Sequence, residues 1–105
     1  MEKQYKTFGD FYPYYLSEHR NTTCRVLHFI GSSLVLAAFA TALITRNAWW
    51  FAAMPLAGYG FAWVGHFFFE KNRPATFTYP LYSFAGDWLM YFQLLAGKIG
   101  FSTRA

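Results

Sequence analysis

The sequence predicts an all-α membrane protein built on a transmembrane helical hairpin, and three observations support this prediction. Hydrophobic residues make up 55% of the 105 residues and charged residues only 13%, whereas soluble domains carry roughly 25% charged residues. Two long stretches, 27–45 and 47–69, contain no Asp, Glu, Lys or Arg. Each stretch reaches the roughly 20 apolar residues that a helix needs to cross about 30 Å of hydrocarbon. The length fits a single domain, residues 1–105.

The first expected element is an amphipathic helix over residues 7–20. Its aromatic side chains recur at the spacing of one helical face, and tyrosines suit the headgroup layer of a membrane. Thr7 and Asp10 are candidates to cap its start, which would leave Pro13 in the first turns, where proline is tolerated. We therefore expect this helix to lie in the membrane interface.

The hairpin is expected to consist of a first span over residues 26–45 and a second over residues 48–69, joined by a tight turn at Arg46 and Asn47. The second span passes Pro55, which can kink a helix. Both spans are rich in small residues about four positions apart, which lets helices approach closely. These residues are Gly31, Ser33, Ala37 and Ala40, then Ala53, Ala57 and Gly60.

A third helix is expected over residues 81–96. Pro80 and Asp87 interrupt its apolar pattern, and a carboxylate at mid-depth in a bilayer is costly unless it has a partner. The segment can be a third span, a re-entrant piece or an interfacial helix. We favour a partly immersed helix that packs on the hairpin.

The basic residues indicate the orientation of the hairpin. Arg20, Arg25, Lys71 and Arg73 flank its open end, whereas only Arg46 marks the turn. The positive-inside rule therefore places the N-terminus in the cytoplasm. The net charge of +4 lies at the ends of the apolar stretches, so nucleic acid is not an expected partner.

Three histidines are the candidate functional residues. Counted from the centre of the turn, His28 lies about 18.5 residues before and His66 about 19.5 residues after, so their depths differ by about 1.5 Å. Two imidazoles at matching depth on antiparallel helices can converge on one ion. His19 can fold back towards them, and Glu70 shares the helical face of His66 and is a candidate fourth ligand or orienting group.

This donor set suits iron, zinc or copper, but other interpretations stay open. His28 and His66 could instead hold a haem in an electron carrier, or the histidines could be incidental residues of a non-enzymatic membrane scaffold. The single cysteine, Cys24, excludes an intrachain disulfide and a multi-cysteine metal site. The sequence leaves open whether copies of the chain form a homo-oligomer. Candidates to bind a substrate carboxylate bidentately are Arg20, Arg25 and Arg73.

Two segments together resemble a known family. They are FYPYYLSEHRN (residues 11–21), continuing through Arg25 to HFIG (28–31), and WVGHFFFEKNRPA (63–75). They are similar to the small membrane family, long labelled a domain of unknown function, that includes the yeast 2-hydroxy fatty acid dioxygenase. The similarity covers roughly residues 8–97. The tail YPLYSFAGDW (79–88) resembles the compact bacterial branch.

The resemblance implies a membrane enzyme that uses ferrous iron and O2 to shorten a long-chain 2-hydroxy fatty acid by one carbon, the oxidative step of alpha-oxidation. It also implies that the metal ligands are His19, His28 and His66, and that the membrane is a bacterial inner membrane or, in a eukaryote, the endoplasmic reticulum. In purified protein we expect iron, or zinc in its place, and not haem.

Overall fold

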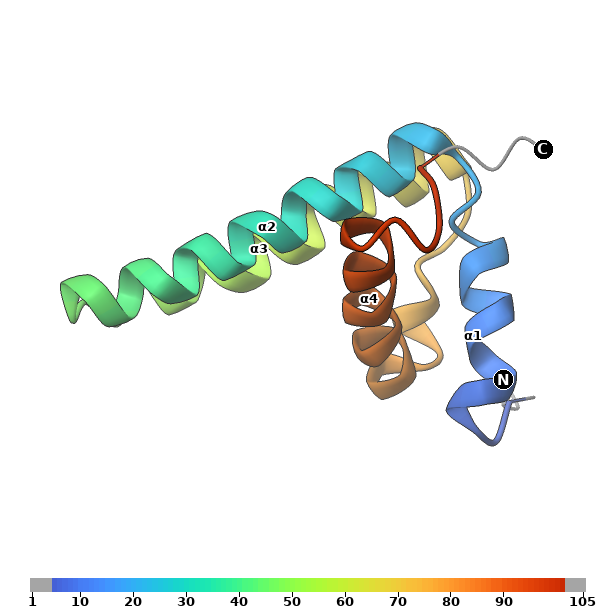
Figure 1. Cartoon of the computed structure of the whole chain (residues 1–105), viewed down its shortest axis with the longest axis horizontal. Helices are drawn as coiled ribbons and strands as arrows, with labels where there is room; N and C mark the ends of the chain where they lie inside the picture. Colours follow the sequence, from blue (N-terminus) through green and yellow to red (C-terminus); the bar gives the residue numbers. More distant parts are fainter. Residues whose placement is uncertain (1–4, 102–105) are drawn as a thin grey trace.

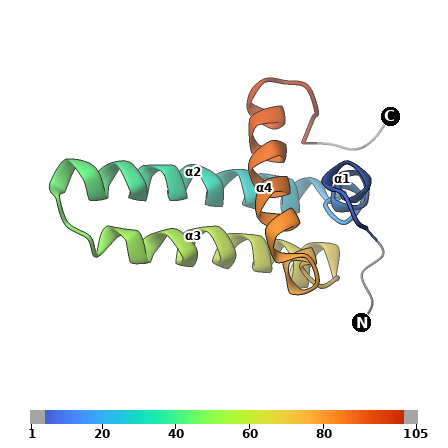
Figure 2. The same ribbon diagram turned by 90° about the horizontal axis from the view of Figure 1, so that it is seen from below.

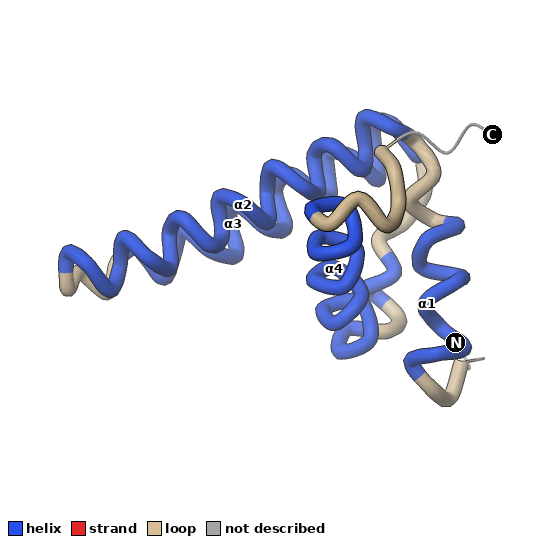
Figure 3. Tube along the Cα trace, in the orientation of Figure 1, coloured by secondary structure: helices blue, strands red, loops and turns tan. Residues whose placement is uncertain are grey.

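The computed structural model describes residues 5–101, and every regular element in this part of the chain is helical (Figures 1 and 3). The all-α class is therefore confirmed. In chain order the elements are α1 (Phe8–Ser17), α2 (Thr22–Thr45), α3 (Trp50–Val64), the π-helix η1 (Gly65–Glu70), the 3-10 helix η2 (Ala75–Phe77) and α4 (Pro80–Leu95). Helices α2 and α3 form a long hairpin, and α1 and α4 gather beside its open end (Figure 2).

Helix α1 is shorter than the predicted 7–20. The Thr7 hydroxyl accepts a hydrogen bond from the Asp10 backbone N–H at 3.1 Å, so Thr7 is the N-cap, and the helix ends at Ser17. Its buried aromatic residues pack into the main hydrophobic core with residues of the chain's second half. This core consists of Phe11, Tyr15, Ala75, Tyr79, Met90 and Leu94. The early end of α1 leaves His19 in the loop that leads to α2.

The hairpin follows the predicted order with shifted boundaries. Helix α2 begins at Thr22 rather than at residue 26, because the Asn21 side chain accepts a hydrogen bond from the Cys24 backbone N–H at 3.1 Å and caps it. The left-handed Arg46, with φ 55°, ends α2 at the predicted turn. Helix α3 contains Pro55, and η1 continues it directly as far as Glu70.

Helices α2 and α3 come closest where small residues allow it. A Cβ atom added at Gly31 would lie 2.9 Å from Phe61 Cβ and 3.0 Å from the Ala57 carbonyl oxygen, both closer than normal contact. The predicted small-residue packing is thus confirmed at Gly31. Gly60 faces open space, so it does not contribute to this contact.

Of the described helices, only α2 is long and apolar enough to cross a membrane, by its length and composition. The predicted second span is divided into the 15-residue α3 and the π-helix, so α3 alone is too short. The hairpin is not covered like the core helix of a soluble domain, because only 28% of the apolar window of α2 is buried and α3 has no buried residue. Large apolar side chains exposed on the hairpin include Leu34, Leu36, Phe39, Leu43, Ile44, Phe51 and Leu56. A surface of this kind requires cover by lipid or by another protein.

Helix α4 packs on the hairpin, as predicted, but it crosses the hairpin steeply near its open end instead of running beside α2 and α3 (Figures 1 and 2). The rings of Phe29 and Tyr91 stack with centroids 4.8 Å apart, and the hydroxyls of Ser33 and Tyr91 are 3.0 Å apart. Helix α4 therefore does not run parallel to the two hairpin helices. Asp87 has the partner that its position requires, because the Tyr15 hydroxyl donates a hydrogen bond to it.

Candidate metal centre

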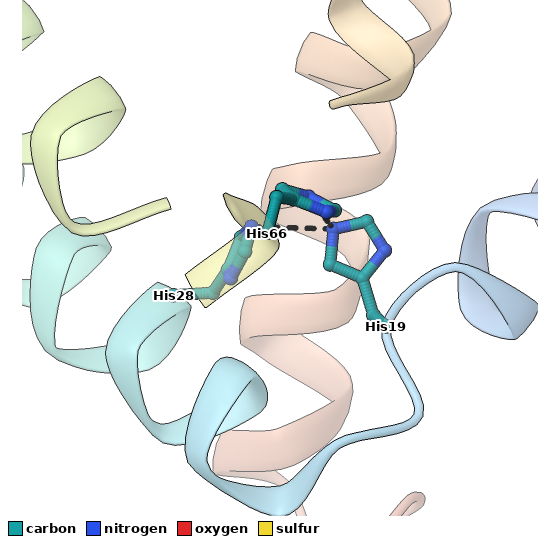
Figure 4. A group of neighbouring side chains, drawn as sticks. All are labelled: His19, His28 and His66. Atoms are coloured by element: carbon teal, nitrogen blue, oxygen red, sulfur yellow. Dashed lines mark hydrogen bonds between the residues drawn. The ribbon is translucent and has the colours of Figure 1, made fainter. Parts of the chain in front are cut away.

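The three histidines come from three separate segments and meet at one point (Figure 4). His19 lies in the loop between α1 and α2, His28 in the second turn of α2, and His66 in η1. The Nε2 atom of His19 lies 3.2 Å from that of His28 and 2.9 Å from that of His66. All three side chains are buried, and together they offer ligand atoms that lie within 4.8 Å of one another.

The second ring nitrogen of each histidine, Nδ1, is held by an oxygen that can only accept a hydrogen bond. The partners are the Tyr15 carbonyl at 2.6 Å for His19, the Cys24 carbonyl at 2.8 Å for His28, and Asn72 Oδ1 at 2.7 Å for His66. Each neutral imidazole therefore carries its proton on Nδ1 and presents a lone pair at Nε2. Three lone pairs facing one another repel unless a cation lies among them. The arrangement is that of a metal donor set with its orienting hydrogen bonds already made.

The position of His66 depends on the local backbone around η1. Gly65 lies against α2, where an added Cβ would be only 2.9 Å from Cys24 Sγ. The π-helix ends at Lys71, which has a left-handed φ of 58°. This reversal turns the chain back, so that the Asn72 backbone N–H donates to the His66 carbonyl at 3.0 Å. Such single π-helical turns are frequent at functional sites.

Asn72 links the segments that carry His66 and His19. Its side-chain N–H donates to the Glu18 carbonyl at 3.1 Å, which leaves its amide oxygen to face His66. The same contact joins η1 to the loop that precedes α2. One side chain thus orients an imidazole and holds two segments of the site together.

The loop that carries His19 is fixed by two further contacts. The Arg25 side chain is buried, and its Nε donates to the His19 carbonyl at 2.6 Å while Nη1 donates to the Gly100 carbonyl at 2.7 Å. The Tyr15 ring stacks on the His19 imidazole with centroids 4.0 Å apart. Burial, and after it the nearby His28 and His66, hold the pKa of His19 well below its ordinary range. His19 therefore stays neutral, which is the form that binds metal.

A family model described as "2-hydroxy-palmitic acid dioxygenase Mpo1-like" matches residues 5–99. The chain belongs to this family. No curated protein and no solved structure matches it. The match covers every helix of the structure and all three histidines, so the resemblance seen in the sequence motifs is confirmed. The Mpo1-like family connects the chain to chemistry related to 2-hydroxy fatty acid oxidation.

The other predicted site residues of this Mpo1-like chain do not join the three histidines. Glu70 Oε2 accepts a hydrogen bond from the Asn21 backbone N–H at 2.5 Å, at the start of α2, and it is outside the group of converging ligand atoms. Arg20 and Arg73 are exposed near the histidine segments. Arg25 is buried and donates to backbone carbonyls, as described above.

Several residues around the histidines were not predicted from the sequence. Asn72 stands in the same quoted segment as His66, which is the one signal that could have suggested it. In the sequence Asp87 is recognisable only as a carboxylate that interrupts an apolar segment, and no pattern distinguishes Ser83. Both border a small hollow of about 20 Å³ beside the three histidines.

Proposed function

We propose that this protein is a membrane-embedded, non-haem iron dioxygenase that shortens long-chain 2-hydroxy fatty acids by one carbon. The observation that carries the proposal is the convergence of three Nε2 lone pairs, buried at the open end of an apolar hairpin. The name of the family supports the same reaction. A water-soluble substrate would gain nothing from a site at the base of an apolar hairpin.

The proposed ligands are His19, His28 and His66. Three imidazoles suit ferrous iron, with zinc as the substitute in purified protein, and they leave coordination positions free. Bound iron would supply the one-electron chemistry through which O2 reacts with an organic substrate. The chain's own contribution is to fix the three rings through their Nδ1 partners and to bury them, so that the site is formed before substrate arrives.

The proposed reaction balances without an external reductant. A 2-hydroxy acid, R–CH(OH)–COOH, and O2 give R–COOH, CO2 and H2O. The bond between C1 and C2 breaks, C2 becomes the new carboxyl carbon, and the four electrons lost by C1 and C2 reduce O2. Oxygen uptake should therefore equal the amount of shortened acid formed.

The membrane placement is part of the proposal. The hairpin would cross the bilayer, with α1 and α4 in the headgroup layer and the N-terminus in the cytoplasm. The histidines then lie near the depth at which a fatty acid holds its carboxylate. Arg20 and Arg73, which are exposed near the same end of the hairpin, are the candidates to attract that carboxylate before it reaches the buried histidines.

The haem alternative receives no support from the geometry. The Nε2 atoms of His66 and His19 are only 2.9 Å apart. The hollow beside the three rings has a volume of only about 20 Å³. A macrocycle would have to displace these side chains. We therefore expect purified protein to lack the strong Soret absorption band of haem.

Metal analysis tests the ligand assignment. Purified protein should hold about one iron or zinc ion per chain, and His19→Ala, His28→Ala and His66→Ala should each remove most of it, because each ligand contributes much of the affinity. Glu70→Ala is the matched control, since its carboxylate binds a backbone N–H and not the ring nitrogens. Full metal content in all three histidine variants would show that the cluster is not a metal site.

The reaction is tested with protein reconstituted with ferrous iron in detergent or lipid. Oxygen uptake should require a long-chain 2-hydroxy acid, and mass spectrometry should detect the fatty acid one carbon shorter. Unhydroxylated fatty acid should be inert, because it lacks the C2 oxygen that can bind a metal together with the carboxylate. Iron-loaded protein that shortens no 2-hydroxy acid of any chain length would refute the proposed reaction.

A further inference from the structure

An apolar groove of about 240 Å³ lies between the hairpin and α4. Its walls include Val35 of α2, Met54 and Gly58 of α3, and Phe84 and Trp88 of α4. Gly58 lies close to Val35 across the groove, because a Cβ added at Gly58 would be 3.2 Å from Val35 Cγ2. The groove therefore offers an apolar surface formed by three helices. Metal binding by the three histidines does not by itself require this surface.

This groove adjoins the small hollow beside the histidines. Four residues line both spaces, namely His28, Tyr59, Ala62 and Asp87. His28 is itself one of the converging imidazoles, so the groove ends at the candidate metal centre. A molecule lying in the groove would present one end to the three Nε2 atoms.

The hollow also contains an unpartnered polar group. Ser83 has only 2% of its surface exposed, and its hydroxyl is the one buried side-chain polar atom without a hydrogen bond in the described part of the chain. A buried hydroxyl left unpaired costs free energy. Ser83 lines the hollow together with Asp87, which lies one helical turn later in α4. A polar atom of a ligand placed there would satisfy the Ser83 hydroxyl.

We infer that the groove is the binding site for the alkyl chain of a single-chain amphiphile, whose polar head lies in the hollow with Ser83 and the three histidines. The inference rests on the proposed function for the nature of the head. From Ala62 to Met54 the groove follows eight residues of α3, or about 12 Å. Met54 therefore marks the far end and limits the length of chain that is held.

The exposed groove residues show where the chain enters. Pro55 and Tyr59 of α3 and Phe84 of α4 line the groove and are also exposed on the surface of the molecule. In a membrane this opening faces the acyl region, so a chain can slide in sideways without leaving the apolar phase. Specificity for chain length then follows from the depth of the groove, and not from the bilayer.

The test measures binding rather than turnover. Metal-loaded protein in detergent, kept free of oxygen, is cross-linked to a 2-hydroxy fatty acid that carries a photoactivatable group on its chain. Unlabelled 2-hydroxy acids of increasing chain length then compete. Each methylene that becomes buried should raise affinity roughly fourfold, until the groove is full and the affinity reaches a plateau.

Two matched substitutions decide the outcome. Met54→Trp places a larger ring at the far end and should move the plateau to shorter chains, with at least tenfold weaker binding of the longest acids and unchanged binding of the short ones. Leu56→Trp is the control, because Leu56 is 76% exposed on the same helix and does not line the groove. The wild type should be cross-linked at groove residues such as Val35 and Trp88.

An unchanged plateau in Met54→Trp, or an equal shift in Leu56→Trp, would overturn the inference, because partitioning into detergent would then account for the chain-length effect. The two proposals fail separately. A plateau that shifts as expected in protein that shortens no 2-hydroxy acid supports the groove and refutes the reaction. Shortening of 2-hydroxy acids without the shift supports the reaction and refutes the groove.

Discussion

Replacement of Gly65 by alanine tests whether the close contact between η1 and α2 fixes the metal centre. The added Cβ would lie 2.9 Å from Cys24 Sγ and 3.2 Å from Cys24 Cα. Non-bonded heavy atoms prefer separations of about 3.5–4.0 Å, so η1 must move away from α2 by roughly 0.5–1 Å. His66 follows Gly65 directly in η1, whereas His28 stays on α2. The displacement therefore separates two of the three ligands.

Metal–ligand distances are held to within about 0.2 Å, so a shift of this size cannot leave the affinity unchanged. We expect Gly65→Ala to bind zinc or ferrous iron roughly 10–100-fold more weakly, the loss seen when the support of a ligand is removed. The free energy of unfolding should also fall by about 1–3 kcal/mol, as for other overpacked sites. Competition against a chromophoric chelator measures the affinity, and thermal unfolding without metal measures the stability.

The chain offers a control and a rescue for this experiment. Gly60→Ala changes the same residue type on the same helical run where nothing lies within 4 Å of the new Cβ, so it should bind metal as the wild type does. Cys24→Ala removes the Sγ atom, and combining it with Gly65→Ala should recover part of the lost affinity. Wild-type affinity in Gly65→Ala, or a loss that Cys24→Ala fails to reduce at all, would refute this account of the site.

Two further predictions concern the support of the site and its orientation. Asn72→Ala removes the oxygen that accepts a hydrogen bond from His66 Nδ1 and should weaken metal binding roughly 10–100-fold, whereas Asn72→Asp keeps an acceptor and should lose less affinity. Competition with a chelator measures the metal affinity of both variants. Equal affinities in the wild type and the two variants would contradict the role of Asn72. Cysteine placed at Asn47 in a Cys24→Ser background should react with an impermeant thiol reagent in intact cells, because the positive-inside rule puts the turn outside; labelling only after permeabilisation would reverse the topology.

The convergence of His28 and His66 could be predicted from the sequence because it depends only on constant helix rise and on the position of one turn. Arg46 ends α2 at the predicted place, so the count along each helix brings the two histidines to the same level. The all-α class follows in the same way from the long uncharged stretches. Both predictions use quantities that hardly change with tertiary context.

The remaining features depend on contacts that no periodic pattern records. Helix α2 starts four residues earlier than predicted because a single side chain, Asn21, caps it. The second apolar stretch divides into α3 and a π-helix at Gly65, which lies against Cys24 of α2. The residues on both sides of this boundary are apolar, so the sequence pattern does not mark it. Asn72 can orient His66 only because Lys71 adopts a left-handed backbone conformation. Glycine is the residue that usually marks such a position in a sequence, and here the residue is lysine.

The arrangement of the three candidate ligands also explains why the chain combines a hairpin with a crossing helix. A hairpin alone can bring two histidines to one depth, but it cannot exclude water from its open end. Helix α4 packs across that end, and α1 packs on α4 through Tyr15, whose ring stacks on His19 and whose hydroxyl binds Asp87. The third ligand is therefore held by the same contacts that close the site. The His19 ring depends on α1, through the Tyr15 carbonyl and the Tyr15 ring, whereas the His19 backbone is also held by Arg25 of α2. Loosening α1 should therefore release the His19 ring first and leave His28 and His66 together.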